Sequence, residues 1–279
     1  MDKIYRCMLN NGKIRIFYAN TSESCYKICE RHNLNFTCTD ALCRLLSISS
    51  IMGIMQKSGK LTVKIDGNGP MKCLVVDADC DGNIRGFIAN PNIDPKLSVS
   101  EGIGENGLLT VIKDFGMKRN FSSQIELRTS EIGDDFSYYF KESEQVPSYV
   151  AVGTRIYNGK LYSGALIVQL MPGYKDEDEL YLSNFSKNCP KFSDLIIIDD
   201  IENLLKELFP DIEILSTHDV NFKCNCSKER YINALATLPK EDLDNMILDN
   251  KDIELTCNFC NSKYKLSVED IKASRAIKE

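Results

Sequence analysis

The apolar and polar positions in the first part of the chain alternate in short runs that predict β-strands. The runs "KIYRCML" and "KIRIFYA" flank Asn10-Asn11-Gly12. This kind of turn tolerates positive φ, so we expect a hairpin there. Further strands are expected at "KLTVKID", "MKCLVVDAD", "NIRGFIA", "LLTVIKD" and, with a weaker pattern, "SSQIELR". The runs "SYVAVGTRIY" and "LYSGALIVQL", joined by Asn158-Gly159, predict a second hairpin.

Helical spacing interrupts these strands. A helix is indicated in "TSESCYKICERHN" by apolar positions at helical spacing and by Thr21 or Ser22 as a cap. The longest candidate, "TDALCRLLSISSIMGIMQKSG", has Thr39 or Asp40 as a cap and is apolar around most of its circumference, which predicts a buried helix. Together with the acidic amphipathic stretch "EIGDDFSYYFKES", these patterns predict an α+β domain with mixed helices and sheet over residues 1–174.

The pattern changes after Pro172-Gly173. Four consecutive acids, Asp176 to Glu179, favour a helix N-terminus, where the macrodipole stabilises negative charge. The stretch "DDIENLLKELFP" repeats this arrangement and ends at Pro210. We therefore expect a helical linker over residues 175–217. Its apolar stripe, which needs a partner such as a folded C-terminal module, consists of Ile201, Leu204, Leu205 and Leu208.

The residues that carry chemistry are concentrated in the C-terminal segment, 218–279, where cysteines recur in two close pairs. Cys224 and Cys226 are separated by one residue, and Cys257 and Cys260, thirty residues further on, are separated by two. Four thiolates in two pairs are the ligand set of a closed tetrahedral zinc site. We expect one Zn²⁺ per chain there, because packing alone rarely places two pairs at ligand spacing.

The rest of this segment predicts a small domain with little core. Two helices are expected between the cysteine pairs, in "SKERYINALATL" and "PKEDLDNMILD", and a strand in "SKYKLS" follows the second pair. A final helix in "SVEDIKASRAI" opens with Ser267 and Asp270 in a capping-box arrangement. A domain this small needs a crosslink, and zinc supplies one.

The single residue between Cys224 and Cys226 points to redox chemistry. Structural zinc sites usually separate paired cysteines by two to four residues. One intervening residue gives an extended or sharply bent backbone and allows a strained disulfide if the metal leaves. Strained disulfides are the labile, regulatory kind, and zinc keeps the thiols as reactive thiolates. The pattern therefore indicates a redox-switch domain that loses its fold when it loses its metal.

Charge and composition limit the other classes of function. The chain has 279 residues with 34 basic and 40 acidic side chains, net charge -6, so no overall field favours nucleic acid or an anionic membrane. No apolar run approaches the length that spans a bilayer, and the start of the chain has no apolar signal core. We expect a cytoplasmic protein with no membrane partner. Its twelve cysteines should then be thiols unless a metal or a redox role claims them.

Enzymatic activity has little support in the sequence, and we expect none. The glycine-rich stretches "DGNGP" and "EGIGENG" lack the lysine and hydroxyl residues of a phosphate-binding loop and indicate turns. The two histidines, His32 and His218, have no G-x-S-x-G motif beside them. His218 is a rival zinc ligand, but with four cysteines available we expect it to be a surface or hinge residue.

The main alternative is a zinc-ribbon-like module that binds nucleic acid or a transcription partner. Residues 219–279 contain ten basic and eleven acidic side chains, which is a weak footprint for phosphate contacts. The charge therefore favours a sensor without a nucleic-acid partner.

A C-x-C pair, a long interval and a C-x-x-C pair at the end of an α+β domain resemble the 33 kDa chaperonin family of redox-regulated heat-shock chaperones. The stretches "GKLTVKIDGNGPMKCLVVDADCDGNIRGFI" and "YYFKESEQVPSYV" are also similar to the family, and "SEQVP" at 143–147 supports the resemblance independently. The resemblance covers essentially the whole chain.

The resemblance implies a holdase that works without ATP. When reduced, Cys224, Cys226, Cys257 and Cys260 would bind one zinc ion and the protein would be inactive. Oxidation would form the disulfides Cys224–Cys226 and Cys257–Cys260, release zinc, unfold the redox-switch domain and loosen the linker. The active form would be a homodimer that binds unfolding client proteins and later passes them to ATP-dependent foldases.

Two further expectations accompany the resemblance. The stripe of Leu204, Leu205 and Leu208 is our candidate for client binding. Eight cysteines lie outside the family's motif, and we interpret them mainly as small buried hydrophobes, above all those on apolar faces such as Cys25, Cys29 and Cys43. The eight are Cys7, Cys25, Cys29, Cys38, Cys43, Cys73, Cys80 and Cys189.

Overall fold

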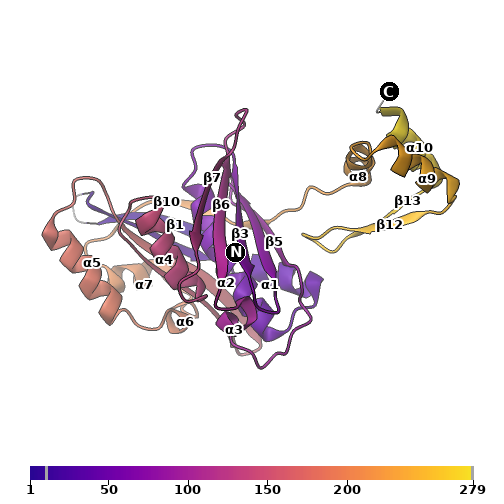
Figure 1. The fold of residues 1–279 in the computed structure, drawn as a ribbon. Helices are drawn as coiled ribbons and strands as arrows, with labels where there is room; N and C mark the ends of the chain where they lie inside the picture. The colour runs from indigo at the N-terminus through magenta and orange to yellow at the C-terminus, as the bar shows by residue number, and fades with distance from the viewer. Residues whose placement is uncertain (10–11, 278–279) are drawn as a thin grey trace. The chain divides into compact units, whose positions relative to one another are not determined.

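Two sheets and the helices packed on them account for the first of two units in the chain. The computed structural model describes residues 1–9 and 12–277, and it divides into two compact units between Lys223 and Cys224. Figure 1 labels the elements of both units along the chain. The α+β class expected from the sequence is confirmed.

An antiparallel sheet in the order β10-β1-β2-β9-β8 is assembled from the start and the later part of the first unit. β1 and β2 pair along their whole length, so the expected hairpin is confirmed in its strands, although Asn10 and Asn11 of its turn lie outside the described residues. The second expected hairpin, β8–β9, turns at Asn158 and Gly159, which both have positive φ. These strands are Lys3–Leu9 (β1), Ile14–Asn20 (β2), Ser148–Tyr157 (β8), Lys160–Leu170 (β9) and Glu213–Asp219 (β10).

The other strands of the first unit form a sheet in the order β11-β5-β4-β3-β6-β7. Its strands alternate as the sequence predicts: in β4, Leu74, Val76 and Ala78 are buried while the positions between them are half-buried. "SSQIELR" contributes strand β7, and the short β11, which was not expected, pairs parallel with β5. The strands are Lys60–Gly67 (β3), Cys73–Asp79 (β4), Asn83–Ile88 (β5), Gly107–Asp114 (β6), Phe121–Glu126 (β7) and Asn221–Phe222 (β11).

Helix α2 (Phe36–Ile54) lies between these two sheets and contacts strands of both. Almost all of its positions are buried, as its apolar circumference predicts. The expected cap at Thr39 or Asp40 is wrong, because Asn35 caps the helix earlier: its side-chain oxygen accepts the backbone N–H three residues on at 2.9 Å. Asp40 instead pairs with Arg44 at 2.7 Å.

Helix α1 (Ser22–His32) begins at the position that the sequence predicts, but a distant residue satisfies its first N–H groups. The Asp2 carboxylate accepts from the N–H of Glu23 at 2.9 Å and from that of Ser24 at 2.6 Å, whereas Thr21 provides no side-chain cap. Negative charge at this helix end is stabilising. The remaining helices before residue 175 are α3 (Val99–Ile103), which was not expected, and α4 (Ile132–Glu142), which was.

Residues 175–217 pack within the first unit and do not form a wholly helical linker. The expected helices are present, but a strand follows them, and this strand, β10, pairs antiparallel with β1. The residues of β10 are alternately exposed and half-buried, and none is fully buried, so its sequence lacks the apolar pattern that would predict a strand. Its pairing depends on the open edge of β1. The helices are α5 (Asp176–Asn188), α6 (Phe192–Leu195) and α7 (Ile201–Leu208).

The apolar stripe of α7 is covered by its own unit. Leu204 is 3% exposed and Leu205 is 0% exposed, and both belong to an apolar cluster with β1, β2 and β9. Leu208 is half-buried against the same cluster. The partner of the stripe is therefore the five-stranded sheet, which corrects the expectation that a C-terminal module provides it. Because α2 covers one face of this sheet and α5–α7 the other, β2 and β9 are buried on both faces.

The second unit contains, among its described residues, an antiparallel β12–β13 hairpin and helices that pack beside it. The expected capping box is confirmed: the N–H of Ser267 donates to Asp270 at 2.7 Å, and the N–H of Asp270 donates back to the Ser267 hydroxyl at 3.3 Å. Strand β12 was not expected. The elements are α8 (Lys228–Leu235), α9 (Lys240–Leu248), β12 (Ile253–Thr256), β13 (Lys263–Leu266) and α10 (Val268–Ile277).

Truncation tests the contribution of β10 to the first unit. A fragment of residues 1–223 retains both sheets, whereas a fragment of residues 1–212 exposes the edge of β1 and loses the pairing along β10. We expect the shorter fragment to unfold at a temperature lower by about 10 °C or more, measured by circular dichroism. Equal unfolding temperatures would show that β10 is dispensable and that the segment behaves as a linker.

Candidate metal centre

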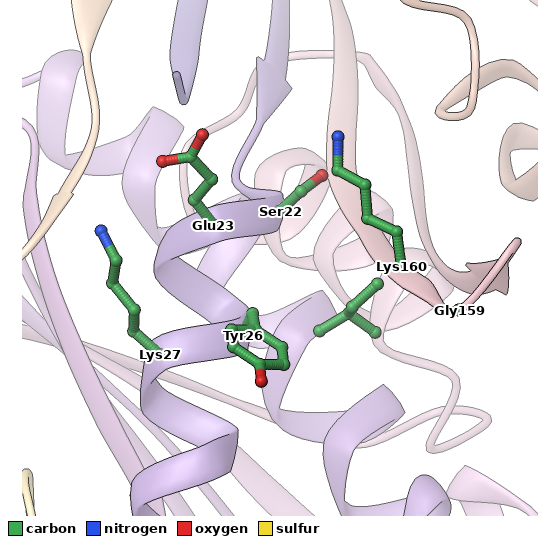
Figure 2. Close-up of a pocket in the computed structure, with 7 residues that line it drawn as sticks. Ser22, Glu23, Tyr26, Lys27, Gly159 and Lys160 are labelled. Atoms are coloured by element: carbon green, nitrogen blue, oxygen red, sulfur yellow. The ribbon is translucent and has the colours of Figure 1, made fainter.

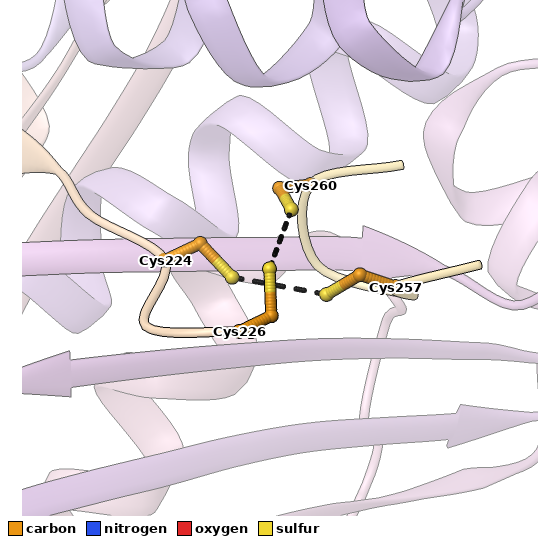
Figure 3. Close-up of side chains that lie close together, drawn as sticks. All are labelled: Cys224, Cys226, Cys257 and Cys260. Carbon is orange, nitrogen blue, oxygen red and sulfur yellow. Dashed lines mark hydrogen bonds between the residues drawn. The ribbon is translucent and has the colours of Figure 1, made fainter. Parts of the chain in front are cut away.

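Four cysteine sulfurs converge in the second unit. The Sγ atoms of Cys224, Cys226, Cys257 and Cys260 all lie within 4.8 Å of one another. The dashed lines in Figure 3 mark two contacts that join one sequence pair to the other: Cys224 to Cys257 at 3.7 Å and Cys226 to Cys260 at 3.3 Å. The structure thus brings together all four ligands that the sequence predicted. It is the one cluster of potential metal ligands among the described residues.

The Cys224–Cys226 segment has no regular secondary structure, and the start of α8 holds it in place. The hydroxyl of Ser227 caps α8 by accepting the N–H of Arg230 at 3.2 Å. The guanidinium of the same Arg230 donates to the carbonyl of Asn225 at 2.8 Å. The residue between the two cysteines is therefore fixed by the first turn of the helix that follows, which keeps the two sulfurs directed at a common point.

The Cys257–Cys260 pair occupies the turn between β12 and β13. The N–H of Asn261 donates to the carbonyl of Cys257 at 2.8 Å, and the N–H of Cys257 donates to the carbonyl of Ser262 at 2.9 Å. Asn261 has a φ of 58°, in the left-handed region that asparagine tolerates better than most residues. This tight turn places both sulfurs on the same side, and both cysteines are buried.

The spacing of the sulfurs fits a four-coordinate metal ion. A tetrahedral Zn²⁺ with zinc–sulfur bonds of about 2.3 Å separates its ligands by about 3.8 Å. The Cys224–Cys257 distance of 3.7 Å matches this value, and the Cys226–Cys260 distance of 3.3 Å needs only a small expansion. Four sulfurs leave no open position, which is typical of a structural site. The set would bind a soft or borderline cation such as Zn²⁺.

The surroundings of the sulfurs affect the thiols unequally. Burial raises the pKa of Cys224 to about 12, and burial also raises the pKa of Cys226. Burial acts in the same direction on Cys260, but hydrogen bonds with Ser262, Cys226 and Cys224 together outweigh it and lower the pKa of Cys260 to about 7. Because metal binding requires thiolates, a bound cation would offset the cost of charging Cys224 and Cys226, whose pKa values are raised.

Two tyrosines that the sequence analysis did not assign to the site lie against the sulfurs. The Tyr264 hydroxyl is 3.1 Å from Cys226 Sγ and donates to the carbonyl of Cys226 at 3.2 Å. Its hydrogen bond to Cys226 raises the pKa of Tyr264 to about 12. The ring of Tyr231, from α8, lies 5.2 Å from that of Tyr264. The available signal was the position of Tyr264 four residues after Cys260 on a strand, which sequence alone does not relate to Cys226.

The second unit has a small apolar core. Its described aliphatic side chains that are buried are Leu243, Leu266, Val268 and Ile271. Both large apolar clusters of the described chain lie in the first unit. With so little apolar burial, the energy that holds this unit together must come largely from whatever joins its four sulfurs.

The remaining candidate residues lie outside this cluster. His218 is on β10, 3.1 Å from the Ser216 hydroxyl, and is not a member of the sulfur cluster. Leu204, Leu205 and Leu208 belong to the first unit. The expectation that Cys25, Cys29 and Cys43 are buried is confirmed. Among the described residues, no helix has the length and apolar character that a bilayer crossing requires.

Comparison with known proteins identifies the family. The model of the family described as Hsp33 protein matches residues 2–267. The chain is 37% identical to the 33 kDa chaperonin of Bacillus licheniformis, with 99% of each chain covered, and 37% identical to that of Bacillus cereus, with 97% of each covered. The crystal structure of the 33 kDa chaperonin (heat shock protein 33 homolog) from Thermotoga maritima superimposes with a TM-score of 0.88 at 28% identity, covering 99% of this chain and 98% of that one. Because the family model and these relatives span nearly the whole chain, the protein belongs to the Hsp33 family of chaperones.

Proposed function

We propose that the protein is a redox-regulated holdase that binds unfolding client proteins without ATP, acts by binding and not by catalysis, and works in the cytoplasm. The observation that carries this proposal is the convergence of four cysteine sulfurs within 4.8 Å in a unit with few buried apolar side chains. Membership of a chaperone family supplies the general activity. The cysteine cluster supplies a plausible means of control.

In the proposed inactive state, Cys224, Cys226, Cys257 and Cys260 hold one Zn²⁺ as thiolates. The ion supplies the positive charge that the buried thiolates need. The chain's own residues keep the site closed: Arg230 fixes the Cys224–Cys226 loop, and the β12–β13 turn fixes the other pair. In this state the metal contributes most of the stability of the second unit.

In the proposed active state, each pair of thiolates loses two electrons to an oxidant such as a peroxide, which is reduced to water. The expected products are the disulfides Cys224–Cys226 and Cys257–Cys260. All four sulfurs lie within 4.8 Å of one another, so both bonds are within reach. Disulfide sulfurs carry no charge to hold Zn²⁺, so the ion leaves and the second unit unfolds.

The first unit contains a covered apolar surface that unfolding of the second unit would help to uncover. One residue, Lys223, separates Cys224 from β11, a two-residue strand, and β11 follows β10 after a single residue. Unfolding of the second unit would leave these strands at a free chain end, and their fraying would loosen the segment that packs α5–α7 on the five-stranded sheet. The surface beneath includes Tyr18, Leu166 and Val168. We propose that this face and the α7 stripe of Leu204, Leu205 and Leu208 hold clients.

Two further parts of the proposal rest on the family resemblance alone. The active form is a homodimer, and bound clients are later transferred to ATP-dependent foldases. A zinc-ribbon-like module that binds nucleic acid remains the alternative function. Its support is weak, because residues 219–279 carry one more acidic than basic side chain and so offer little excess charge to phosphates.

The redox switch can be tested directly in the purified, zinc-loaded protein. Treatment with hydrogen peroxide at mild heat is expected to release one zinc ion per chain and, at the same rate, to suppress aggregation of a thermally unfolding client. A metal-sensitive dye and light scattering follow the two signals. Zinc that stays bound, or zinc release without holdase activity, would contradict the proposal. Salt-sensitive binding of nucleic acid by the reduced form would favour the zinc-ribbon alternative.

The contribution of the Tyr264 hydroxyl to metal retention can be tested by Tyr264→Phe, which keeps the ring. Loss of its hydrogen bond to Cys226 is expected to lower zinc affinity about 10-fold, measured by competition with a chelator. Tyr174→Phe, which alters an exposed tyrosine of the first unit, serves as the control. An unchanged zinc affinity in the Tyr264 variant would show that the four sulfurs alone determine retention.

The client-binding stripe is best tested at Leu208, because it is half-buried and its substitution disturbs the fold less than that of Leu204 or Leu205. Leu208→Ser is expected to reduce holdase activity of the oxidised protein severalfold while leaving zinc release unchanged. Leu108→Ser, on β6 of the other sheet, is the matched control. Full activity of the Leu208 variant would exclude the stripe as a binding surface.

A further inference from the structure

A second group of cysteines lies in the first unit, where α1 packs on α2. Cys29 of α1 and Cys43 of α2 face each other with their Sγ atoms 3.5 Å apart. Cys25, one helical turn before Cys29, lies 3.5 Å from the Thr21 hydroxyl and 3.9 Å from the carbonyl of Cys43. Both Cys25 and Cys29 therefore adjoin Cys43, and the sulfur–sulfur distance of 3.5 Å brings Cys29 and Cys43 into direct contact.

A surface pocket leads to one member of this group. Its volume is about 290 Å³, and Cys29 lines it together with Tyr26, Glu30 and Leu161. It adjoins a larger pocket of about 400 Å³, drawn in Figure 2, and the two share Tyr26, Gly159 and Leu161 between α1 and the β8–β9 hairpin. Cys29 is 6% exposed, whereas Cys25 and Cys43 are 0% exposed. A small molecule in the pocket can therefore reach Cys29 before the other two thiols.

We propose that Cys29 and Cys43 form a second redox site, in which Cys29 reacts with a small neutral peroxide from the pocket and Cys43 then closes a disulfide. Nothing in the proposed zinc switch uses these residues. We infer the Cys29–Cys43 pairing from the short distance between the two sulfurs, and we infer that Cys29 reacts first because it lines the pocket. Hydrogen peroxide, which is small and uncharged, is the probe that fits a pocket of this size.

The chemistry balances in two steps. The Cys29 thiolate attacks one oxygen of hydrogen peroxide, the O–O bond breaks, and the leaving hydroxide takes a proton to form water, which leaves Cys29 as a sulfenic acid. The Cys43 thiol then attacks the Cys29 sulfur, a second water leaves, and the S–S bond forms. Closing the bond from 3.5 Å requires each sulfur to move by less than about 1 Å.

The environment of Cys43 is consistent with its role as the second thiol. Burial, together with its contacts to Cys25 and Cys29, raises the pKa of Cys43 well above its usual value. A raised pKa disfavours the reactive thiolate at Cys43 and makes this cysteine a poor first target for peroxide. The resulting bond would join α1 to α2, the helix between the two sheets, and so would tie the first unit together under oxidant.

The test uses the full-length, zinc-loaded protein treated with hydrogen peroxide, quenched in acid, alkylated under denaturing conditions and digested with trypsin without reduction. Cleavage after Lys27, Arg31 and Arg44 isolates Cys29 in the peptide 28–31 and places Cys43 in the peptide 32–44. We expect mass spectrometry to find these two peptides linked. Formation of the link should be at least about tenfold faster than oxidation of Cys7 and Cys25, which are fully buried.

Two variants sharpen the assignment. Cys38 shares the peptide 32–44, so Cys38→Ser should retain the link and thereby assign it to Cys43. Cys43→Ser should abolish the link and accumulate a sulfenic acid at Cys29 that dimedone traps. If a variant does not fold, fragmentation of the linked wild-type peptide makes the same assignment.

Either of two results would overturn the proposal. One is the absence of the 28–31 to 32–44 link in wild-type protein whose four C-terminal cysteines are already oxidised, which shows that the oxidant was sufficient. The other is oxidation of Cys7 and Cys25 in parallel with Cys29, which would show that unfolding of the first unit, and not the pocket, gives access. Neither result depends on holdase activity, so the proposed function stands or falls separately.

Discussion

The fold of the second unit depends on how its four cysteine sulfurs are held together. The unit buries few aliphatic side chains among its described residues, and its hairpin and helices have too little apolar contact to be stable alone. Hydrogen bonds nevertheless hold the backbone around the sulfurs: Arg230 supports the Cys224–Cys226 loop, and the turn at Asn261 supports the Cys257–Cys260 pair. A unit with ordered ligands and a weak core is one in which metal binding and folding are the same event.

Because of this dependence, a chemical change at the four sulfurs would alter the stability of the whole second unit. In the proposed switch, oxidation of the thiolates would remove negative charge and ligand capacity at once, so a change of a few bonds would remove most of the energy that stabilises the unit. The first unit is constructed differently. Its core is large, and its five-stranded sheet is buried on both faces by α2 and by α5–α7. Loss of the outer helical layer would therefore expose apolar surface while the rest of the core remains packed, which is the property a holdase requires.

The cysteines of the chain follow the same division. Those of the second unit lie on loops and a turn, close to one another and to the Tyr264 hydroxyl, in an arrangement that could hold a metal ion. Those between α1 and α2 are packed in a core, and the pocket beside α1 reaches one of them, Cys29. Proximity of sulfurs is common to both groups, whereas access and charge differ, so the two groups would respond to different strengths of oxidant.

The α+β class, most helices and strands, the four candidate metal ligands and the family resemblance could all be predicted from the amino-acid sequence. These predictions rest on the alternation of apolar residues, on helical spacing and on cysteine spacing, which are patterns among residues close together in the sequence. The sequence did not predict that Asp2 caps α1, that β10 forms a strand or that Tyr264 lies against Cys226. Each of these features depends on a contact between residues that are far apart in the sequence. The same reason explains the α7 stripe. The periodicity of α7 showed that Leu204 and Leu205 form an apolar face that must be covered. It could not show that the five-stranded sheet covers them, because the hydrophobic effect is non-directional and any apolar surface can serve as the partner.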